Sequence, residues 1–384
     1  MSDEYYQRAL DNVRKLNRER RLSPVASNGY PESFEKQSSL VLFSGNDYLG
    51  LSTHPAVKEA AVKAIADYGM GPRGSALMCG FTELHRALSE KLAALKGTAS
   101  CVLFPTGYQA NVGLLTALGT LGGTFFSDEL NHASIVDGCR LARSAKVIYP
   151  HLDMCALEHA LKACKTPLKI VITEEIFSMD GDGAKMEELA LLKARYGFIL
   201  VTDSAHSSGV YGPEGSGWAN ACGVSALADF QVGTLSKAYA SQGGYVCCSH
   251  SAHAWLINTA RPFIFSSALP VPVVASATKA LDLSVRDPSH RKTLWQRVAQ
   301  FQDAHPEVIG PIVPIIVGSE TAALSLSEAL MKSGFHVPAI RPPTVPKGRC
   351  RIRIALSAGH RVQDVSMLLE ALNECEKNRL EQDC

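Results

Sequence analysis

The sequence lacks the features that mark membrane proteins and nucleic-acid-binding proteins. None of its apolar runs reaches the roughly 20 residues that a helix needs to cross a bilayer, and the most apolar stretch, 308–317, is broken by Pro311 and Pro314. The charge is nearly balanced, with 38 basic and 37 acidic residues among 384. Because there is no surplus of Lys and Arg to neutralise phosphates, we expect neither a nucleic acid nor a membrane as a partner.

Common nucleotide-binding and hydrolase motifs are missing as well. The chain has neither G-x-x-x-x-G-K-[ST] nor G-x-S-x-G. Residues 69–74 match G-x-G-x-x-G literally, but a dinucleotide site needs a strand before this turn and a helix directly after it. Here a helical pattern at 54–68 precedes the turn and Pro72 lies inside it. We therefore do not expect a Rossmann-type dehydrogenase.

Cysteine is frequent, with 11 residues, but no two of them form a Cys-x-x-Cys pair. One cluster, Cys247, Cys248, His250 and His253, has metal-binding side chains, yet its spacing matches no standard zinc module, so no metal is expected. The odd cysteine count and an acidic N-terminus that resembles neither a secretory signal nor a transit peptide favour reduced thiols in the cytoplasm. A peroxisomal location is the alternative, although the last residues are not a Ser-Lys-Leu-type signal.

Short β-branched runs alternate with helical patterns through the middle of the chain. They predict strands at 101–104, 124–127, 146–149, 169–173, 198–202, 230–232 and 244–248. Strands separated by helices are typical of an α/β fold, in which a mostly parallel sheet, here of seven strands, is sandwiched by helices.

The clearest helix is predicted at 82–95, where Leu84, Leu88, Leu92 and Leu95 share one face. Further elements are expected as helices at 186–195, 269–287, 292–304, 320–333 and 362–375, and as strands at 312–317 and 351–355. We divide the chain into an N-terminal helical arm and connector at 1–45, a large domain at 46–285 and a small α+β domain at 286–384.

Two predicted strands end near charged side chains, and open α/β sheets place their sites at the carboxyl ends of strands. Asp203 ends an apolar strand, with His206 three residues later, and a carboxylate there is costly unless it meets a cation. Lys237 follows the strand that ends at Thr234, where tight surroundings would lower the pKa of its amine and suit it to Schiff-base chemistry. Taken singly, Asp203 could cap a turn and Lys237 could be one surface lysine among many.

A third segment, 104–111, runs from a strand through a glycine-containing turn into a helix. By itself it is an ordinary connection, but the N-terminus of a helix after such a turn also suits a phosphate. A lysine, an acid and a phosphate cradle together indicate a cofactor with an aldehyde, a ring nitrogen and one phosphate. We therefore predict pyridoxal 5'-phosphate as the cofactor.

Four motifs make the sequence resemble a known family. They are Asn131-His-Ala-Ser, Phe177-Ser-Met-Asp-Gly-Asp, Thr202-Asp-Ser-Ala-His and Thr234-Leu-Ser-Lys-Ala. As a set they resemble the α-oxoamine synthases, which are fold-type-I pyridoxal-phosphate enzymes that join an amino acid to an acyl thioester. The resemblance implies the fold-type-I transferase fold, with a large cofactor-binding domain and a smaller C-terminal one.

Two further segments, Ser44-Gly-Asn-Asp-Tyr-Leu-Gly and Arg341-Pro-Pro-Thr-Val-Pro, narrow the resemblance to the biotin-pathway member of the family. It implies an acyltransferase that condenses L-alanine with a pimeloyl thioester, carried by coenzyme A or a carrier protein, and releases CO2 and free thiol. The alternatives are a family member that joins glycine or serine to a different acyl-CoA, and a non-catalytic partner subunit. The presence of Lys237 argues against the non-catalytic subunit.

The resemblance also implies roles at the cofactor, residue by residue. Lys237 would hold the cofactor through a Schiff base and move the Cα proton, Asp203 would pair with the ring nitrogen, and His132 would stack on the ring. The other implied contacts are Ser178 and His206 at the ring hydroxyl, Gly107, Tyr108 and Thr234 at the phosphate, and Ser266 and Ser267 reaching the phosphate from the neighbouring subunit of a homodimer.

The resemblance places the substrates on a second group of residues. Arg353, with Asn46 nearby, would bind the amino-acid carboxylate, and a planar guanidinium suits a planar carboxylate. Thr344 would contact the acyl substrate, and Arg20 is a further candidate on a looser N-terminal alignment.

The sequence departs from the family's usual pattern at five positions beside these residues. Ser204 and Ser207 replace the second Asp and the Gly of Asp-Asp-Ala-His-Gly, and Glu175 stands where a smaller residue is frequent. Ala76 and Ala240 replace an Arg and a Gly. None of these changes removes a residue with an implied role, so we expect them to alter loop geometry and acyl selectivity rather than the reaction class.

Overall fold

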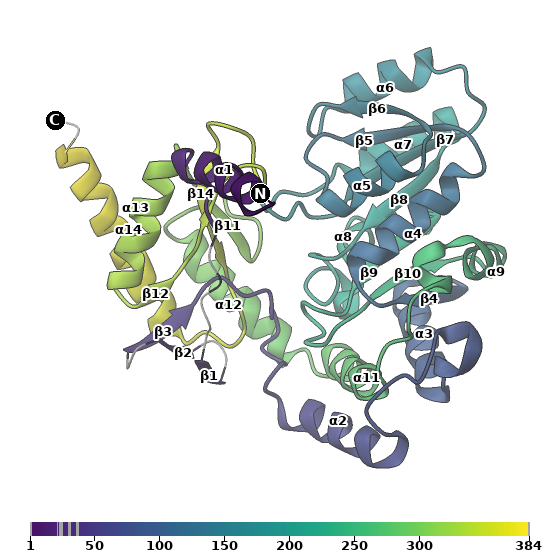
Figure 1. Cartoon of the computed structure of the whole chain (residues 1–384), viewed down its shortest axis with the longest axis horizontal. Helices are drawn as coiled ribbons and strands as arrows, with labels where there is room; N and C mark the ends of the chain where they lie inside the picture. The colour runs from purple at the N-terminus through teal and green to yellow at the C-terminus, as the bar shows by residue number, and fades with distance from the viewer. Residues whose placement is uncertain (1, 21, 23–25, 30–31, 36–37, 383–384) are drawn as a thin grey trace. The chain divides into compact units, whose positions relative to one another are not determined.

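The computed structural model describes residues 2–20, 22, 26–29, 32–35 and 38–382. The chain forms two compact units (Figure 1). The larger unit comprises Leu49–Ser178 and Asp182–Arg291, and the smaller unit comprises Met1–Tyr48, Met179–Gly181 and Lys292–Cys384. Among the described residues, no helix is both long enough and apolar enough to cross a membrane. The three-part division of the chain stays a prediction.

The larger unit is built on a seven-stranded sheet with the strand order β4-β10-β9-β8-β7-β5-β6. Strands β9, β8, β7, β5 and β6 pair in parallel, whereas β10 pairs antiparallel with both β9 and β4. The mostly parallel seven-stranded sheet that the sequence predicts is thus confirmed. The strands are β4 Ser100–Phe104, β5 Thr124–Asp128, β6 Ala145–Tyr149, β7 Lys169–Glu174, β8 Ile199–Asp203, β9 Phe230–Thr234 and β10 Gly244–Cys248.

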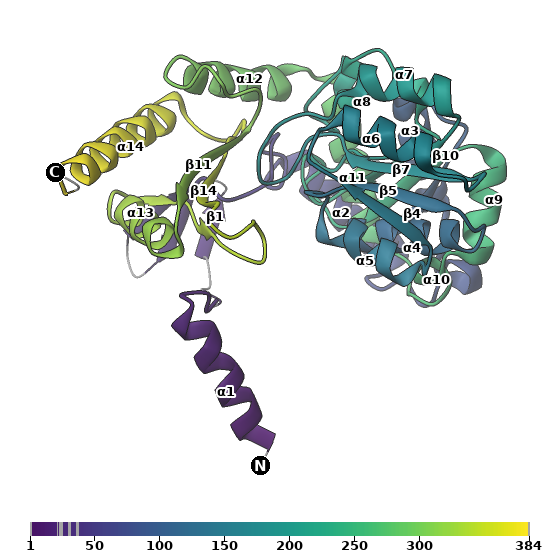
Figure 2. The ribbon, with the colours of Figure 1, turned by 90° about the horizontal axis from the view of Figure 1, so that it is seen from above.

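Helices cover both faces of this sheet, with α4 and α5 on one face and α6 and α7 on the other (Figure 2). Neighbouring strand residues alternate between the two faces. Phe125 therefore packs in the first core and Phe126 in the second. The helices are α2 Pro55–Tyr68, α3 Glu83–Lys96, α4 Gly107–Gly119, α5 Ala133–Leu141, α6 Met154–Ala163, α7 Met186–Tyr196, α8 Trp218–Ala221, α9 His250–Thr259, α10 Arg261–Ile264 and α11 Val271–Arg286.

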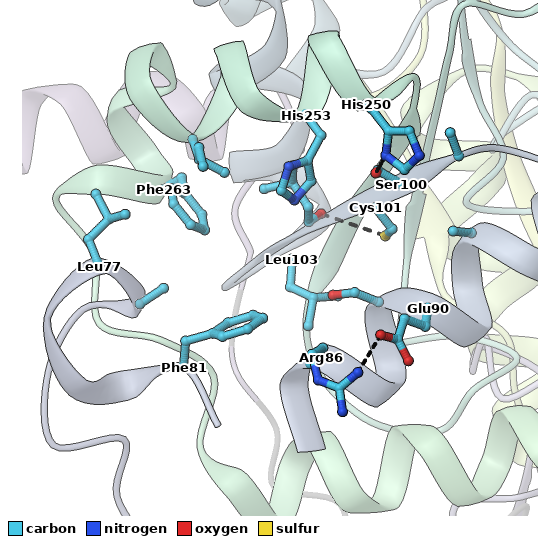
Figure 3. Close-up of a pocket in the computed structure, with 16 residues that line it drawn as sticks. Leu77, Phe81, Arg86, Glu90, Ser100, Cys101, Leu103, His250, His253 and Phe263 are labelled. Atoms are coloured by element: carbon cyan, nitrogen blue, oxygen red, sulfur yellow. Dashed lines mark hydrogen bonds and ion pairs between the residues drawn. The ribbon is translucent and has the colours of Figure 1, made fainter. Parts of the chain in front are cut away.

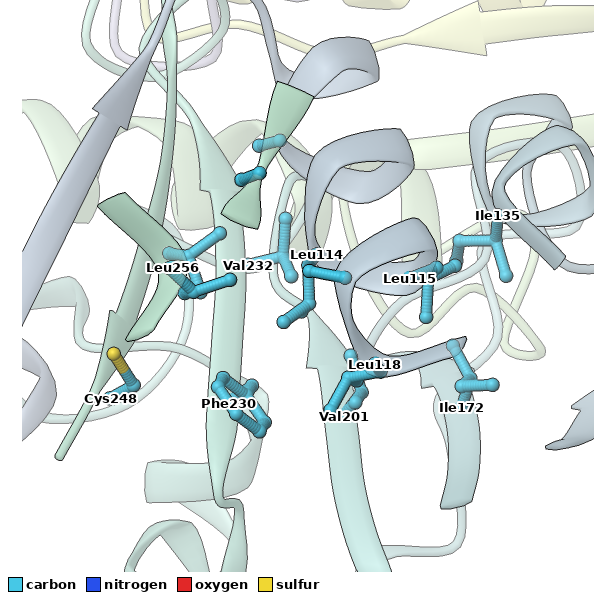
Figure 4. Close-up of a cluster of buried hydrophobic side chains, with 14 of the residues drawn as sticks. Leu114, Leu115, Leu118, Ile135, Ile172, Val201, Phe230, Val232, Cys248 and Leu256 are labelled. Carbon is cyan, nitrogen blue, oxygen red and sulfur yellow. The ribbon is translucent and has the colours of Figure 1, made fainter. Parts of the chain in front are cut away.

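The core between α4 and the sheet fixes the strands whose ends carry the predicted site (Figure 4). Leu114 and Leu118 of α4 pack in one cluster with Ile172, Val201 and Val232 of β7, β8 and β9, and all five are fully buried. Burial of a side chain of this size stabilises the fold by roughly 1.5–3 kcal/mol. The three strands are therefore held as one packed layer.

The predicted helix at 82–95 is confirmed as α3. Its N-terminus is fixed by Thr82, whose backbone N–H donates to Nδ1 of His85 at 3.2 Å. The helix ends at Gly97, which adopts a left-handed conformation with φ of 65°. This capping places Lys96, the last helical residue, inside the larger unit, where its side chain is 1% exposed.

The smaller unit holds a four-stranded sheet, β1-β2-β3-β12, and a three-stranded sheet, β11-β14-β13. Where the sequence suggested a connector after the N-terminal helix, the described residues form three strands, which are short and poor in β-branched and aromatic residues. The elements are α1 Ser2–Lys15, β1 Ala26–Gly29, β2 Glu32–Glu35, β3 Ser38–Leu42, α12 Ser289–Gln302, β11 Ile312–Gly318, α13 Glu320–Lys332, β12 Phe335–His336, β13 Ala339–Ile340, β14 Cys350–Ala355 and α14 Val362–Gln382. Helix α12 belongs to the smaller unit from Lys292 onward.

Candidate active site

The residues predicted to hold the cofactor lie in the larger unit, close to the carboxyl ends of neighbouring strands. Asp203 is the last residue of β8, Thr234 is the last residue of β9, and Lys237 follows three residues later. Strands β7, β8 and β9 pair side by side in parallel. Residues that follow their ends therefore share one edge of the sheet.

The charges of Lys237 and Asp203 both influence the pKa of one side chain, His132, which caps the N-terminus of α5. Desolvation lowers the pKa of His132, the charge of Asp203 raises it, and the charge of Lys237 lowers it. The residue as a whole is still exposed. Its orientation is set by Ser134, whose Oγ lies 2.8 Å from Nδ1 of His132. The amine and the carboxylate required by the sequence argument therefore belong to one neighbourhood.

Asp203 is buried, with 6% of its surface exposed, and both of its carboxylate oxygens accept hydrogen bonds. Oδ2 accepts from Nδ2 of Asn111 at 2.6 Å, and Oδ1 accepts from the backbone N–H of Ala205 at 2.9 Å. Asn111 comes from α4 and also donates to Oγ of Ser134 at 2.9 Å. These contacts fix the orientation of the carboxylate and tie it to the residue that orients His132.

Lys237 and His206 are in direct contact, with Nζ of the lysine 2.8 Å from Nε2 of the histidine. His206 is buried and Lys237 is half-buried. Ser178, the other residue predicted at the ring hydroxyl, follows β7 and is also buried. The amine is thus held at the edge of the site by an imidazole that comes from the loop after β8.

Sequence reasoning missed two residues of this site, Asn111 and Glu174. Glu174 ends β7, is the neighbour of Asp203 in the parallel register, and is 3% exposed. Burial and then the charge of Asp203 raise the pKa of Glu174 to about 8, although Lys237 opposes the shift. Within the described part of the chain, Oε1 of Glu174 and Oδ1 of Asn111 find no hydrogen-bond partner. A carboxylate at the end of a predicted strand was the signal that could have found Glu174.

The N-terminus of α4 forms the second part of the site. The side chain of Thr106 caps this helix by accepting from the backbone N–H of Gln109 at 3.1 Å. The neighbouring strand passes so closely that a Cβ on Gly244 would lie 2.4 Å from the carbonyl oxygen of Thr106, and a Cβ on Gly107 would lie 3.2 Å from Cβ of Thr234. Glycines therefore keep this helix end bare beside the Thr234 hydroxyl, where its first N–H groups suit a phosphate.

The donor set fits pyridoxal 5'-phosphate. It combines an amine for the aldehyde, a fixed carboxylate for the ring nitrogen, an imidazole for the ring and the N-terminus of α4 for the phosphate. The two unpartnered oxygens beside Asp203 are further polar atoms that a bound ligand or its water shell can satisfy.

The remaining predicted phosphate contacts lie near α4. Tyr108 is 44% exposed, and its hydroxyl donates to the carboxylate of Asp137. Oγ of Ser266 accepts from Nε2 of Gln109 at 3.4 Å, and Ser267 forms a β-bridge with Ser75. Ser266 and Ser267 are therefore anchored within their own chain, and their role toward a neighbouring subunit stays a prediction.

In the smaller unit, the residues predicted to bind the amino-acid carboxylate are in contact. Both terminal nitrogens of Arg353 donate to Oδ1 of Asn46 at 3.1 Å, and Nη2 also donates to the hydroxyl of Tyr48 at 3.4 Å. Arg353 lies on β14 and is 6% exposed. Its guanidinium is thus oriented by neutral oxygen atoms, an arrangement that suits a planar anionic ligand.

The two residues predicted at the acyl substrate also meet in the smaller unit. Nη2 of Arg20 donates to Oγ1 of Thr344 at 3.4 Å and to the carbonyl oxygen of Pro342 at 3.5 Å. Thr344 is exposed. The structure therefore pairs Arg20 with the Pro-Pro-Thr segment, and the role of both residues toward the acyl substrate stays a prediction.

A cavity of about 490 Å³ lies elsewhere in the larger unit (Figure 3). Its wall is largely apolar, with side chains such as Leu77, Phe81 and Phe263, and includes His250 and His253 of the cysteine–histidine cluster. None of the residues predicted at the cofactor lines it. In the described ranges, no group of three or more His, Cys, Asp or Glu side chains could hold a metal ion. The chemistry of the side chains, rather than the size of a cavity, identifies the site.

Comparisons with known proteins agree with this site. The family model described as aminotransferase class I and II matches residues 38–372. The chain is 46% identical over 355 residues to 8-amino-7-oxononanoate synthase of Arabidopsis thaliana, covering 88% of this chain and 75% of that protein. It is 43% identical over 373 residues to 8-amino-7-oxononanoate synthase of Geobacter sulfurreducens, covering 94% of this chain and 95% of that protein.

Among solved structures, the chain is similar to SPT, a serine palmitoyltransferase, with a PLP internal aldimine. The TM-score is 0.87, the sequence identity is 28%, and the match covers 96% of each chain. Sequence and structure thus point to one family. The chain belongs to the class I and II aminotransferase family and, within it, to the 8-amino-7-oxononanoate synthases.

Proposed function

We propose that the chain condenses L-alanine with a pimeloyl thioester and forms 8-amino-7-oxononanoate, CO2 and free thiol, with pyridoxal 5'-phosphate as cofactor. The observation that carries this proposal is the position of Asp203 and Lys237 at and just after the ends of the adjacent parallel strands β8 and β9, with the charges of both acting on His132. Relatives at 46% and 43% identity that are named for this product support it, as does the PLP in a related solved structure.

When bound, the cofactor supplies an electron sink for a carbanion at the Cα of the amino acid. The side chains of the chain do the rest. Lys237, held 2.8 Å from His206, binds the cofactor aldehyde between turnovers and takes and returns the Cα proton during them. Asp203, oriented by Asn111, pairs with the ring nitrogen. His132 covers one face of the ring and excludes water there.

The overall reaction balances with these groups. A C–C bond forms between Cα of alanine and the acyl carbonyl carbon, and the C–S bond of the thioester breaks with release of the thiol. The bond from Cα to the carboxylate then breaks and gives CO2, and a proton returns to Cα. The acyl donor is a thioester of coenzyme A or of a carrier protein.

Substrate binding is the role proposed for the residues of the smaller unit. Arg353, oriented by Asn46, takes the alanine carboxylate through a paired hydrogen-bond geometry. Thr344 and Arg20, which hydrogen-bond to each other, contact the pimeloyl thioester. An arginine beside the acyl chain also offers a partner for its terminal carboxylate.

A homodimer in the cytoplasm completes the proposal. Ser266 and Ser267 reach the cofactor phosphate of the neighbouring subunit, so one copy alone leaves that contact unmade. The described cysteines are free thiols, and buried ones such as Cys101 and Cys247 suit a reducing compartment. Dissociation of the dimer by dilution should lower the affinity for the cofactor.

A substrate-pair assay tests the function. Alanine, glycine or serine is supplied with pimeloyl-, succinyl-, acetyl- or palmitoyl-CoA, and thiol release is followed for the wild type and for Lys237→Ala. We expect turnover with alanine and the pimeloyl thioester, and almost none in the variant. Turnover only with glycine and a short acyl group would refute the assignment. A colourless protein that binds no cofactor would favour a non-catalytic partner subunit.

A further inference from the structure

A buried cation lies next to the loop that carries Asp203. Lys96, the last residue of α3, is 1% exposed. Its Nζ donates to Oγ of Ser204 at 3.0 Å and to the carbonyl oxygen of Ser216 at 2.6 Å. A buried ammonium group is costly unless an anion accompanies it.

The matching anion is Glu175, which is fully buried. Its Oε1 accepts from Oγ1 of Thr202 at 3.1 Å. Its Oε2 accepts from the backbone N–H of Trp218 at 2.9 Å and from the hydroxyl of Ser207. Both carboxylate oxygens are therefore hydrogen-bonded inside the protein.

The two charges lie close together. A Cβ placed on Gly217 would be 2.8 Å from Oε2 of Glu175 and 3.0 Å from Nζ of Lys96. Burial lowers the pKa of Lys96, and nearby groups raise it again, first Glu175, then Cys247 and last Asp203. Lys96 therefore interacts both with Glu175 and with the carboxylate assigned to the cofactor ring nitrogen.

The contacts of this pair enclose Asp203 along the chain. Glu175 holds Thr202 before it and Ser207 after it, and Lys96 holds Ser204 directly after it. In addition, the backbone N–H of Glu175 donates to the carbonyl oxygen of Asp203 at 2.8 Å. The short segment 202–207, which also contains His206, is thus fastened at several points to these two buried side chains.

Glu175, Ser204 and Ser207 are three of the five departures from the usual family pattern. The resemblance expects a carboxylate at position 204, where this chain has a hydroxyl that accepts from Lys96. It expects a smaller residue at position 175, where this chain has the carboxylate. The three departures therefore belong to one arrangement. The buried carboxylate stands at position 175 instead of position 204, and it still contacts the loop that contains Asp203.

We propose that Lys96 and Glu175 are a pair of positioning residues that hold segment 202–207 so that Asp203 and His206 are placed for the cofactor, and that Glu175 takes the place of the acid expected at position 204. This inference rests on the proposed function. The pair does not touch the cofactor and acts through Asp203 and His206.

The alternative is a pair that only stabilises the fold, and variants can separate the two. We would compare the wild type with K96M, E175Q, the double variant K96M/E175Q and E175Q/S204D. The matched control is E158Q, which removes a carboxylate paired with Arg195 elsewhere in the larger unit. The readouts are the melting temperature of the cofactor-free protein, the dissociation constant for pyridoxal 5'-phosphate, and the visible absorbance of the bound cofactor before and after borohydride.

Either single variant should lower the melting temperature, because it leaves one charge buried without its partner. The double variant should recover most of this loss, because no buried charge remains, yet it should still bind the cofactor about tenfold or more weakly, the size usual when a supporting residue is removed. E175Q/S204D should bind more tightly than E175Q. If a single variant does not fold, the double variant still decides the question.

Wild-type cofactor affinity and absorbance in the double variant would overturn the inference and leave a purely structural pair. Affinity in E175Q/S204D no better than in E175Q would refute the exchange of positions 204 and 175. Both results leave the proposed function intact. If instead the wild type itself binds no cofactor that borohydride can fix to Lys237, the proposed function fails first.

Discussion

Two neighbourhoods of the larger unit each contain one lysine and one buried carboxylate, and they are built differently. Beside Lys237 and Asp203, two further polar side chains each keep an oxygen atom that no group in the described chain satisfies, and Lys237 itself is only half-buried. Around Lys96 and Glu175, both side chains are buried and the charged atoms are hydrogen-bonded within the protein.

This difference separates a site that a ligand completes from one that is already complete. Buried polar groups in folded proteins are normally paired, and the oxygens left unpaired beside the amine and the imidazole can be satisfied by a bound ligand or water. Oε1 of Gln231, whose Nε2 donates to the carbonyl oxygen of Lys96, is likewise unpaired, but the charged atoms of Lys96 and Glu175 are buried and hydrogen-bonded, which makes the chain around them rigid. The charge types are the same in both neighbourhoods, and only the completeness of their contacts differs.

The largest difference between the two neighbourhoods should appear when each lysine is replaced by alanine. Lys237→Ala should lower turnover by more than about a thousandfold, since the amine is the proposed proton carrier, while the melting temperature of the cofactor-free protein changes little. Lys96→Ala should instead lower the free energy of unfolding by about 3–5 kcal/mol, because Glu175 is left buried without its cation. Steady-state kinetics and urea unfolding of both variants measure the two effects. A Lys237→Ala variant with full activity would end the catalytic assignment.

The adjacent residues Glu174 and Glu175 offer a matched pair for the second prediction. Glu175→Gln should cost about 3–5 kcal/mol of unfolding free energy, because Lys96 then has no anion. Glu174→Gln should stabilise rather than destabilise the fold near pH 6, because the pKa of about 8 means that the wild-type carboxyl group takes up a proton on folding, whereas the amide is neutral in both states. Urea titrations near pH 6 compare them directly. Equal losses in the two variants would contradict the distinction between an open and a closed neighbourhood.

The raised pKa of Glu174 should also appear as a pH dependence of the cofactor-free protein. Its pKa is about 8 in the folded chain and 4.5 in the reference state. Between these values the folded state holds a proton that the unfolded state has lost, so Glu174 makes stability fall as the pH rises from about 4.5 to 8. Glu174→Gln should flatten this part of the curve. An unchanged slope in the variant would show that the carboxyl group is not buried as described.

A second pH dependence, with a different cause, should come from His151, which bridges Asp128 at the end of β5 and Asp182. Its Nδ1 lies 2.9 Å from Oδ1 of Asp128 and its Nε2 lies 2.9 Å from Oδ2 of Asp182. Burial alone lowers the pKa of His151, but hydrogen bonds that its imidazole donates to both carboxylates, together with their charges, raise it to about 10. The two contacts of His151 therefore make their full contribution to stability at pH values below about 6.5, the pKa of the imidazole in the unfolded chain. This contribution is lost as the pH rises toward 10.

His151→Gln is the variant that removes the charge of these two contacts. The wild type should lose more stability than the variant between about pH 7 and 10, and the two curves should run parallel below about pH 6. Thermal unfolding of the cofactor-free proteins across this range is the measurement. Parallel curves over the whole range would mean that the imidazole carries no such charge.

The strands of the large sheet could be predicted because each carries its own signal. The run 169–173, for example, is apolar and β-branched and became β7 with one additional residue. The strands of 26–42 could not, because sequences such as Ala-Ser-Asn-Gly have low strand propensity and form a strand only by pairing with a neighbour. Local strand propensity predicted a strand where the same residues are also buried in the sheet. It did not predict a strand where only pairing with a neighbouring strand makes the segment extended.

The candidate site divides in the same way. Asp203, Lys237 and His132 could be named because each stands in a short motif at a strand end or helix start. Glu174 and Asn111 escaped because their importance comes from partners 29 and 92 residues away, namely Asp203 in both cases. Lys96 follows the predicted helix 82–95 and carries no sequence signal of its own, and only the fold shows that it is buried.

The sequence alone determined the kinds of chemistry available to this protein, because residue types and short spacings specify which groups follow each strand and which family they resemble. The tertiary structure decided which of those groups share a neighbourhood. Burial, the parallel register and hydrogen bonds between distant segments set apart Glu174 from Glu175 and Lys237 from Lys96, and no local pattern carries that information, because the energy of a charge depends on what surrounds it.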